Sequence, residues 1–387
     1  MKKWLLIPIT AATLLLSAEA LTPTAAYATE SAYVRLTFTN GGTLSVGSTG
    51  NAIIKNGVAY LPASTAEAAG ITVTVDAPSK RVSFKGWEKS FAVRVGSRSG
   101  ILDGKLVDIG GVPFVSNKQV YIPAKFLVKA LDGGNVVWDA KKKTLLANGL
   151  HMFRSYSEKF EGAEYAVSLD SGELYVTTGQ GAKHKIADLG QLLDVVDFDF
   201  QRTPGGLLRL QVRNVYGEPH FNTAYDTFIL KDGAVLRKAH IAVKSSFGSP
   251  AVWSDGRLIM SDGRTLRLIE DRTGRVLESY DLSKLMGDNA SADPALIYQV
   301  EAFDSDIALI RPYNTGLLTL LNRNTGEQTL LYKEFFDEEL QQQTEEVDPM
   351  TWGDFLTYTG RTGNKLTFTY NTGHEIITFT HTLQTSG

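Results

Sequence analysis

The hydrophobic and polar positions of residues 32–149 follow one pattern that occurs twice. In its clearer copy, residues 121–144 (YIPAKFLVKALDGGNVVWDAKKKT), apolar side chains first recur at helical spacing and then alternate as in a strand. Pro123 suits the first helical position, because its missing N–H would have no intrahelical partner there. Gly133 and Gly134 suit the left-handed conformation that ends a helix. The pattern predicts a strand, a helix and a hairpin.

A weaker copy precedes it at residues 60–81, YLPASTAEAAGITVTVDAPSKR. It has the same tyrosine and proline, a short alanine-rich helix, Gly70 as the helix stop, and an alternating hairpin. The simplest interpretation is a duplicated strand–helix–hairpin unit, an α+β module. In the second copy Trp138 alternates with the hydrophobic face, so we expect this side chain in the core.

From residue 150 onward the pattern changes to short alternating strands. Turn signals that end in glycine recur about every 40 to 60 residues, close to the length of a four-stranded propeller blade. The pattern predicts an all-β domain over 150–387, propeller-like with about five blades; a β-sandwich is the alternative. The turn signals lie at residues 170–172, 231–233, 272–274, 324–326 and 371–373.

Residues 1–28 have the features of a secretory signal peptide. Lys2 and Lys3 precede an apolar run of about 13 residues, and the small-x-small sequence AYA at 26–28 is typical of a cleavage site. The apolar run is shorter than the roughly 20 residues of a spanning helix, which disfavours an uncleaved anchor. We therefore expect a mature chain that begins at Thr29, is secreted or cell-envelope associated, and has no membrane span.

Composition narrows the possible functions. The chain of 387 residues contains no cysteine, which excludes disulfides, thiolate metal sites and a cysteine nucleophile. Its formal net charge is −3, so it has no overall basic character that would attract nucleic acid. After signal cleavage the length is still sufficient for two or three domains with their own cores.

Several motifs of the first part recur together in a known family. They are the turn at 103–105, Tyr121 with Pro123, the helix end before the double glycine, Trp138-Asp139, and the lysine- and threonine-rich turn at 141–144. In this combination residues 32–149 resemble the copper amine oxidase N-terminal-like domain, also called the stalk domain, of exported proteins from Gram-positive bacilli. The resemblance implies a surface interaction module at 29–149 with two copies. The first copy departs from the family pattern, because Val75-Asp76 replaces Trp-Asp.

The residues do not support copper amine oxidase chemistry. That chemistry requires a tyrosine within Thr-x-x-Asn-Tyr-Asp/Glu, and the nearest string, NTAYD at 222–226, has Ala224 before Tyr225. Copper ligands often come from positions i and i+2 of one strand, and no two of the six histidines are so close. We predict no catalytic residue, no cofactor and no metal site.

Two pairs of carboxylates are the candidate ligand residues of the second part. Asp197 and Asp199 lie two positions apart on one predicted strand face, and so do Asp304 and Asp306. Paired carboxylates on one face could bind calcium or serve a glycosidase. The alternative is a solvated face, or a loop in which each aspartate bonds its own backbone.

Two tryptophans and one acidic stretch complete the candidates. Trp253 and Trp352 stand near predicted loops, where exposed rings could bind sugars. Residues 334–350 contain seven carboxylates and no basic residue, and they interrupt the strand pattern. We expect a solvated insertion there, helical or mobile, with recruitment of a basic partner as the alternative.

These features favour a secreted, non-enzymatic binding protein of the cell envelope or surface. Its stalk-like module would act as an interaction unit, and its β domain would present a face to a glycan, a wall polymer or a surface protein. The alternative is an exported carbohydrate-active hydrolase or lyase with its site in the propeller funnel, where the two aspartate pairs would act. A purely structural spacer is a third possibility.

Overall fold

The computed structural model describes residues 30–38, 45–46, 52–179, 181–218, 222–243, 250–288, 296–345 and 353–384. The predicted signal peptide and Trp352 lie outside these residues. Contacts divide the chain into two compact units. The N-terminal unit comprises Met1–Ser157, Tyr165–Tyr175 and Ala187–Leu192, and the C-terminal unit comprises Glu158–Glu164, Val176–Ile186 and Leu193–Gly387. The domain limits expected at residues 28 and 149 stay predictions.

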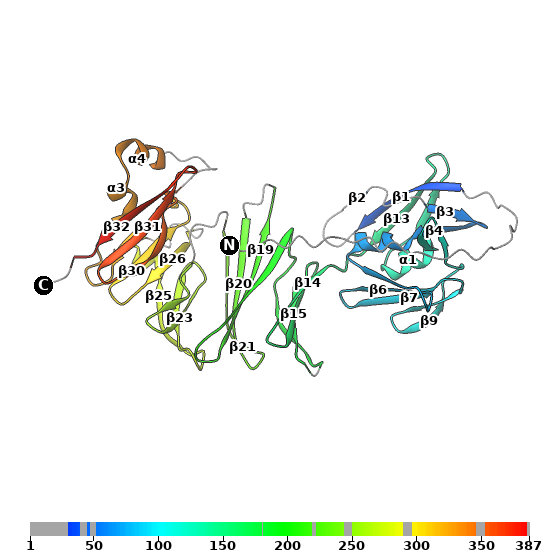
Figure 1. Cartoon of the computed structure of the whole chain (residues 1–387), viewed down its shortest axis with the longest axis horizontal. Helices are drawn as coiled ribbons and strands as arrows, with labels where there is room; N and C mark the ends of the chain where they lie inside the picture. Colours follow the sequence, from blue (N-terminus) through cyan, green and yellow to red (C-terminus); the bar gives the residue numbers. More distant parts are fainter. Residues whose placement is uncertain are drawn as a thin grey trace. The chain divides into compact units, whose positions relative to one another are not determined.

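Two sheets and two short helices build most of the N-terminal unit (Figure 1). One sheet has the order β10-β11-β4-β3-β1-β13-β12, with β2 paired to β1, and the other runs β5-β6-β7-β8-β9. The strands of the first sheet are β1 (Glu30–Phe38), β2 (Ser45–Val46), β3 (Ala52–Lys55), β4 (Val58–Pro62), β10 (Phe114–Ser116), β11 (Gln119–Pro123), β12 (Val136–Asp139) and β13 (Thr144–Leu150). Those of the second are β5 (Thr72–Asp76), β6 (Arg81–Gly86), β7 (Lys89–Arg94), β8 (Ser99–Leu102) and β9 (Lys105–Asp108).

The 3-10 helix η1 (Ala63–Ala69) and the helix α1 (Ala124–Ala130) share one hydrophobic core with both sheets. Leu36 and Leu145 contribute from the first sheet, Phe84 and Phe91 from the second, and Leu127 from α1. Figure 1 shows α1 between the two sheets. Alternation along each strand places one face on this core, which is why apolar and polar residues alternate in the sequence.

Both sequence copies form a strand, a helix and a hairpin. Their first strands, β4 and β11, pair antiparallel with Leu61 opposite Ile122, so that each tyrosine faces the other copy's proline. The hairpins then separate, because β5 and β6 belong to the second sheet while β12 and β13 belong to the first. That the two copies arose by duplication stays a prediction.

The helix ends differ from the prediction in the second copy. Gly70 ends η1 in the left-handed conformation, with φ 74°, as expected. After α1, however, Asp132 adopts positive φ, 52°, and Gly133 and Gly134 do not. Gly133 is required for close packing instead, because an added Cβ would lie 2.8 Å from a side-chain carbon of Val128. The prediction that both glycines supply the left-handed turn is therefore wrong.

Two further details of this copy need correction. Pro123 is the residue before α1, at the N-cap, and not its first residue. Trp138 is not in the core, since 36% of its surface stays exposed. The physical reason is the place of β12 at the edge of its sheet, where few side chains are available to cover an outer position.

The rest of the described chain is mostly β-structure in small antiparallel sheets. Five sheets follow one another in chain order: β14-β15-β16-β17, β18-β19-β20-β21, β22-β23-β24-β25, β26-β27-β28-β29 and β30-β31-β32. Their strands are β14 (Ser155–Phe160), β15 (Ala163–Ser168), β16 (Glu173–Thr177), β17 (Lys183–Asp188), β18 (Val195–Arg202), β19 (Leu208–Tyr216), β20 (Asn222–Lys231), β21 (Ala234–Val243), β22 (Trp253–Ser254), β23 (Arg257–Ser261), β24 (Thr265–Ile269), β25 (Val276–Asp281), β26 (Tyr298–Phe303), β27 (Ile307–Pro312), β28 (Thr319–Asn322), β29 (Gln328–Leu330), β30 (Thr357–Thr362), β31 (Lys365–Asn371) and β32 (Ile376–Thr382).

Three short helices interrupt these sheets: α2 (Leu282–Leu285), α3 (Leu331–Phe335) and α4 (Glu338–Glu345). The helices α3 and α4 contain most of the described part of the acidic stretch, which agrees with the helical one of the two expectations. No helix within the described residues is long and apolar enough to cross a membrane.

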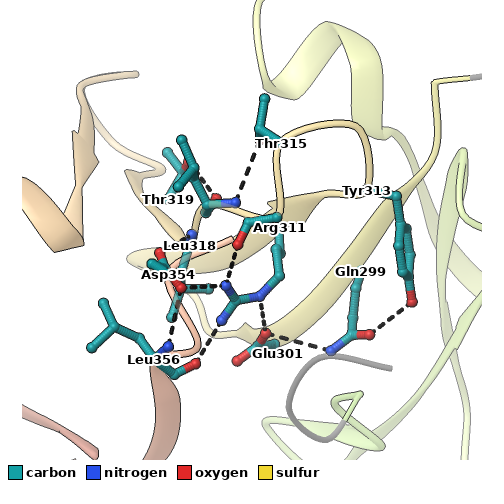
Figure 2. A network of polar contacts seen from close by, with 11 residues as sticks. Gln299, Glu301, Arg311, Tyr313, Thr315, Leu318, Thr319, Asp354 and Leu356 are labelled. Carbon is teal, nitrogen blue, oxygen red and sulfur yellow. Dashed lines mark hydrogen bonds and ion pairs between the residues drawn. The ribbon is translucent and has the colours of Figure 1, made fainter. Parts of the chain in front are cut away.

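A buried guanidinium joins the sheet that contains β27 to the segment that leads into β30 (Figure 2). The side chain of Arg311, on β27, is fully buried, and its Nε donates to Glu301 Oε1 at 2.8 Å. Its Nη1 donates to the carboxylate of Asp354 and to the carbonyl of Gly316, and its Nη2 donates to the carbonyl of Leu356. Every side of the guanidinium therefore has an acceptor.

The carboxylates of this network also accept hydrogen bonds from groups other than Arg311. Asp354 Oδ2 accepts the N–H of Leu318 at 2.6 Å, and Glu301 Oε1 accepts from Gln299 Nε2, whose own Oε1 accepts from Tyr313. Burial raises the pKa of Glu301, against the lowering effect of the Arg311 charge. Such a network is rigid because its buried polar groups hydrogen-bond one another where no water can replace them.

The Arg311→Met variant tests the importance of this network. We expect the free energy of unfolding to fall by about 3–5 kcal/mol, because two buried carboxylates lose their counter-ion. Urea unfolding followed by tryptophan fluorescence measures the change. The matched control is Arg213→Met, which breaks an exposed ion pair and should cost about 1 kcal/mol or less. An equal cost for both variants would contradict a structural role of the Arg311 network.

Candidate functional site

The first predicted carboxylate pair is held by arginines of the neighbouring strand. Asp197, on β18, lies directly opposite Arg213 on β19, and the two form an ion pair with a shortest N–O distance of 2.6 Å. Asp199 pairs with Arg209 at 2.9 Å. Desolvation lowers the pKa of Arg209, whereas the charge of Asp199 raises it. The pair is thus engaged in contacts across the sheet.

The second pair converges on one guanidinium. The prediction that Asp304 and Asp306 lie on one strand face is wrong, because both stand in the turn between β26 and β27. Both contact Arg361 near the end of β30. Arg361 reaches Asp306 with two nitrogens, each 2.7 Å from a carboxylate oxygen, and Asp304 at 3.1 Å. The hydrogen bonds from Arg361 lower the pKa of Asp306, and the same bonds raise the pKa of Arg361. A carboxyl group with a lowered pKa stays ionised and is a poor general acid.

Within the described residues, the candidate tryptophans do not form an exposed aromatic surface for a sugar. Trp253 lies on β22 opposite Leu258, and its half-buried ring packs against an apolar cluster that includes Leu207 and Met260. Trp352 lies outside the described residues. The ring of Trp253 is therefore part of the packing of its sheet.

Histidines and carboxylates of the described ranges do not assemble into a metal-binding group of three or more. Two histidines have carboxylate partners instead. His240 Nδ1 lies 2.8 Å from Asp226, and His381 Nδ1 lies 2.7 Å from Glu334. Burial raises the pKa of Asp226, against the hydrogen bond from His240.

A groove in the C-terminal unit contains the Asp306–Arg361 ion pair. It has a volume of about 520 Å³, and we call it the polar groove. The sheets of β27–β29 and β30–β32 both contribute to its wall. Besides the ion pair, the lining residues used below are Asn322, Glu327, Thr329, Asn364, Thr382 and Gln384.

The strands β27 and β30 explain why the groove has a defined shape. At one end of β27, Arg311 holds the segment before β30 through Asp354 and Leu356. At the other end, the turn with Asp306 is held by Arg361. The intervening cluster, which includes Leu309 of β27, is fully apolar and buried. The two sheets are therefore fastened at both ends, and the groove wall is preorganised.

The polar groove offers hydrogen-bonding groups that the fold itself does not use. Asn322 Oδ1 accepts the N–H groups of Asn324 and Thr325, and within the described residues its amide nitrogen has no partner. The carboxylate of Glu327 and the hydroxyl of Thr382 likewise have no side-chain partner in the described part of the chain. Such a set of donors and acceptors can hydrogen-bond a polar ligand.

Sequence reasoning missed the arginines that neutralise the candidate carboxylates. Arg209 and Arg213 had a weak signal, since two arginines four positions apart follow two aspartates two positions apart, with the sequence TPGG between them. Arg361 had none, because it lies 55 residues after Asp306. The amides and hydroxyls of the groove were missed for the same reason.

Solved structures with some similarity to the chain are of different kinds. Dihydro-heme d1 dehydrogenase NirN is 10% identical with a TM-score of 0.24; the match covers 67% of this chain and 56% of that one. Virginiamycin B lyase from Staphylococcus aureus is 12% identical, with 84% and 88% covered and a TM-score of 0.24. A lectin from Aleuria aurantia, a six-bladed β-propeller with a described fucose recognition mode, is 10% identical, with 90% and 91% covered and a TM-score of 0.25.

This chain thus spans little more than half the length of the dehydrogenase. Similarities at these TM-scores carry no argument about function. A search of the curated proteins finds no match to the sequence. One family model matches the first part of the chain. The matched residues include both sequence copies with Tyr60, Pro62, Tyr121 and Pro123. Residues 39–147 match the copper amine oxidase N-terminal domain, which confirms the resemblance indicated by the motifs.

Proposed function

We propose that this chain is an exported, non-enzymatic binding protein of the cell envelope. In this proposal the signal peptide directs secretion, residues 39–147 form an interaction module, and the C-terminal unit is a propeller-like domain of about five blades. The polar groove of that unit binds a neutral, hydroxyl-rich ligand, that is, a glycan. The observation that carries the proposal is the bidentate pairing of Arg361 with Asp306 inside a groove whose lining also includes several amide and hydroxyl side chains.

A glycan suits the charge and the chemistry of the groove. The charged lining residues Asp306, Glu327 and Arg361 sum to a single negative charge, so neither a strong anion nor a strong cation is favoured. Sugar hydroxyls both donate and accept hydrogen bonds. They match the mixed set of amide, hydroxyl and carboxylate groups from Asn364, Thr329 and their neighbours.

The geometry supports binding more than hydrolysis. A glycosidase needs one carboxylic acid with a raised pKa and a second carboxylate facing it across the scissile bond. In the polar groove Asp306 has a lowered pKa, and Asp304 shares its arginine. The other aspartate pair is bound to Arg209 and Arg213 on a different sheet.

Titration of the mature protein with neutral oligosaccharides tests the proposal. Hexamers of glucose and of N-acetylglucosamine serve as probes in calorimetry. We expect saturable binding that Asn364→Ala and Thr382→Ala each weaken about threefold to tenfold, since each removes one hydrogen bond to the ligand. The matched control is Asn135→Ala, an exposed asparagine outside the groove, which should leave the affinity unchanged.

Two results would contradict this function. Absence of binding to every neutral oligosaccharide would exclude a glycan groove of this kind. Release of new reducing ends or unsaturated sugars by the wild-type protein, abolished in Asp306→Asn, would favour the carbohydrate-active enzyme.

The Asp306–Arg361 pair also predicts a pH dependence of stability. Because Arg361 lowers the pKa of Asp306 below its ordinary value near 3.8, the ionised pair stabilises the fold above that pH. The contribution is lost as the pH falls through the lowered pKa. We expect Arg361→Gln to be less stable than wild type at pH 7 and equally stable at strongly acidic pH. Urea unfolding across this pH range measures the difference, and a constant difference would disprove the pairing.

A further inference from the structure

The outward face of the second sheet of the N-terminal unit carries an unusual arrangement of cations. On β6 the residues Val82 and Phe84 are buried in the core, which turns Arg81, Ser83 and Lys85 to the outside. On β7 the outward positions are Ser90, Ala92 and Arg94, opposite Lys85, Ser83 and Arg81. We call these six outward residues the basic sheet face.

Within the described residues, the cations of this face form no ion pair with a carboxylate. Arg81 lies directly opposite Arg94, and like charges in this position destabilise a sheet. Within the described residues, Arg81 and Lys85 make no ion pair or hydrogen bond through their side chains. Arg94 donates only from Nε, to the backbone oxygen of Ser79 at 3.0 Å. Asp76, opposite Arg81 on the other side, accepts from Ser79.

Several exposed arginines of the same chain do form ion pairs with aspartates. Arg98 pairs with Asp108 on the same sheet at 3.1 Å, and Arg213 pairs with Asp197 on another. Arginine in these positions is neutralised by an aspartate on the neighbouring strand or turn. The opposed arginines of the basic sheet face form no such ion pair within the described residues, although Asp76 lies opposite Arg81 and Glu88 lines one of the depressions described below.

The face is also hollowed. Two adjoining depressions of about 480 Å³ and about 530 Å³ share Arg81, Ala92 and Ile101. Ala92 is buried although it points outward, because the side chains around it are longer. Its small side chain, together with Ser83, lets a ligand come close to the strands between the cations.

We propose that the basic sheet face binds a linear phosphodiester polymer. Guanidinium, ammonium and hydroxyl groups are the side-chain groups that contact phosphates, and this face combines them in Arg81, Lys85 and Ser90. Arg81 and Lys85 stand four residues apart on one strand, roughly 13 Å, so the cations extend over more than one phosphate. The second row is supplied by Arg94 on the adjacent strand.

The same face is unsuited to single-stranded nucleic acid. Proteins that bind single-stranded nucleic acid stack the bases on aromatic rings. Here the rings of Phe84 and Phe91 point into the core and stack on each other with centroids 4.3 Å apart. A polymer whose backbone carries phosphates but no bases fits the exposed groups better. This inference is independent of the glycan groove, which lies in the other unit and has different chemistry.

Titration of the mature chain with poly(glycerol phosphate) at low salt tests the inference. The double variant Arg81→Ser/Arg94→Ser should bind about tenfold more weakly or worse, and the slope of log affinity against log salt should become shallower by about 1 to 2. Its thermal stability should stay the same or rise, because the opposed like charges are removed. A purely structural role of these arginines would predict the opposite change in stability.

The matched control is Lys141→Ser/Lys142→Ser, which removes the same charge from the exposed turn between β12 and β13. It should leave the affinity nearly unchanged. The inference is overturned if poly(glycerol phosphate) does not bind, or if both double variants lose affinity equally. It is also overturned if polyglutamate of equal charge, or vesicles of anionic lipid, bind as tightly through the same arginines.

Discussion

A fully buried guanidinium must be neutralised and hydrogen-bonded on every side, because the interior offers no water to replace a missing partner. Arg311 meets this requirement only when Glu301, Asp354 and the carbonyl of Leu356 are all in place. Glu301 lies in the same sheet as Arg311, whereas Asp354 and Leu356 lie in the segment that leads into β30. The network therefore makes the position of β30 depend on β27, and the wall of the polar groove depends on both strands.

Arginine–carboxylate pairing has two different results in this chain. Around Arg209, Arg213 and Arg361 it converts candidate catalytic carboxylates into fixed parts of the sheets. Around Arg81 and Arg94 no ion pair forms within the described residues, and both guanidinium groups stay available on an open face. The contrast explains why we assign binding to both units, with a neutral ligand for one and an anionic polymer for the other.

Local features were predictable where a few neighbouring residues determine them. The strand–helix–hairpin elements of both copies, the stop at Gly70 and the β-structure after residue 150 follow from periodicity and turn chemistry, and the structure contains them. The predictions were wrong where tertiary packing determined the role of a residue. Gly133 was needed beside Val128 and not for its left-handed conformation, and Trp138 stays exposed because β12 is an edge strand.

By itself, the sequence determined the likeness of residues 39–147 to the copper amine oxidase N-terminal domain, the mostly β character of the rest, and the place of Asp197 and Asp199 on one strand. Only the tertiary structure decided what the candidate aspartates do. Asp306 meets Arg361 across 55 residues because two separate sheets come together, and Asp197 meets Arg213 through strand register. Alternation along a strand specifies which side of a sheet a residue occupies, but its partners depend on pairing and packing between sheets, which no local pattern encodes.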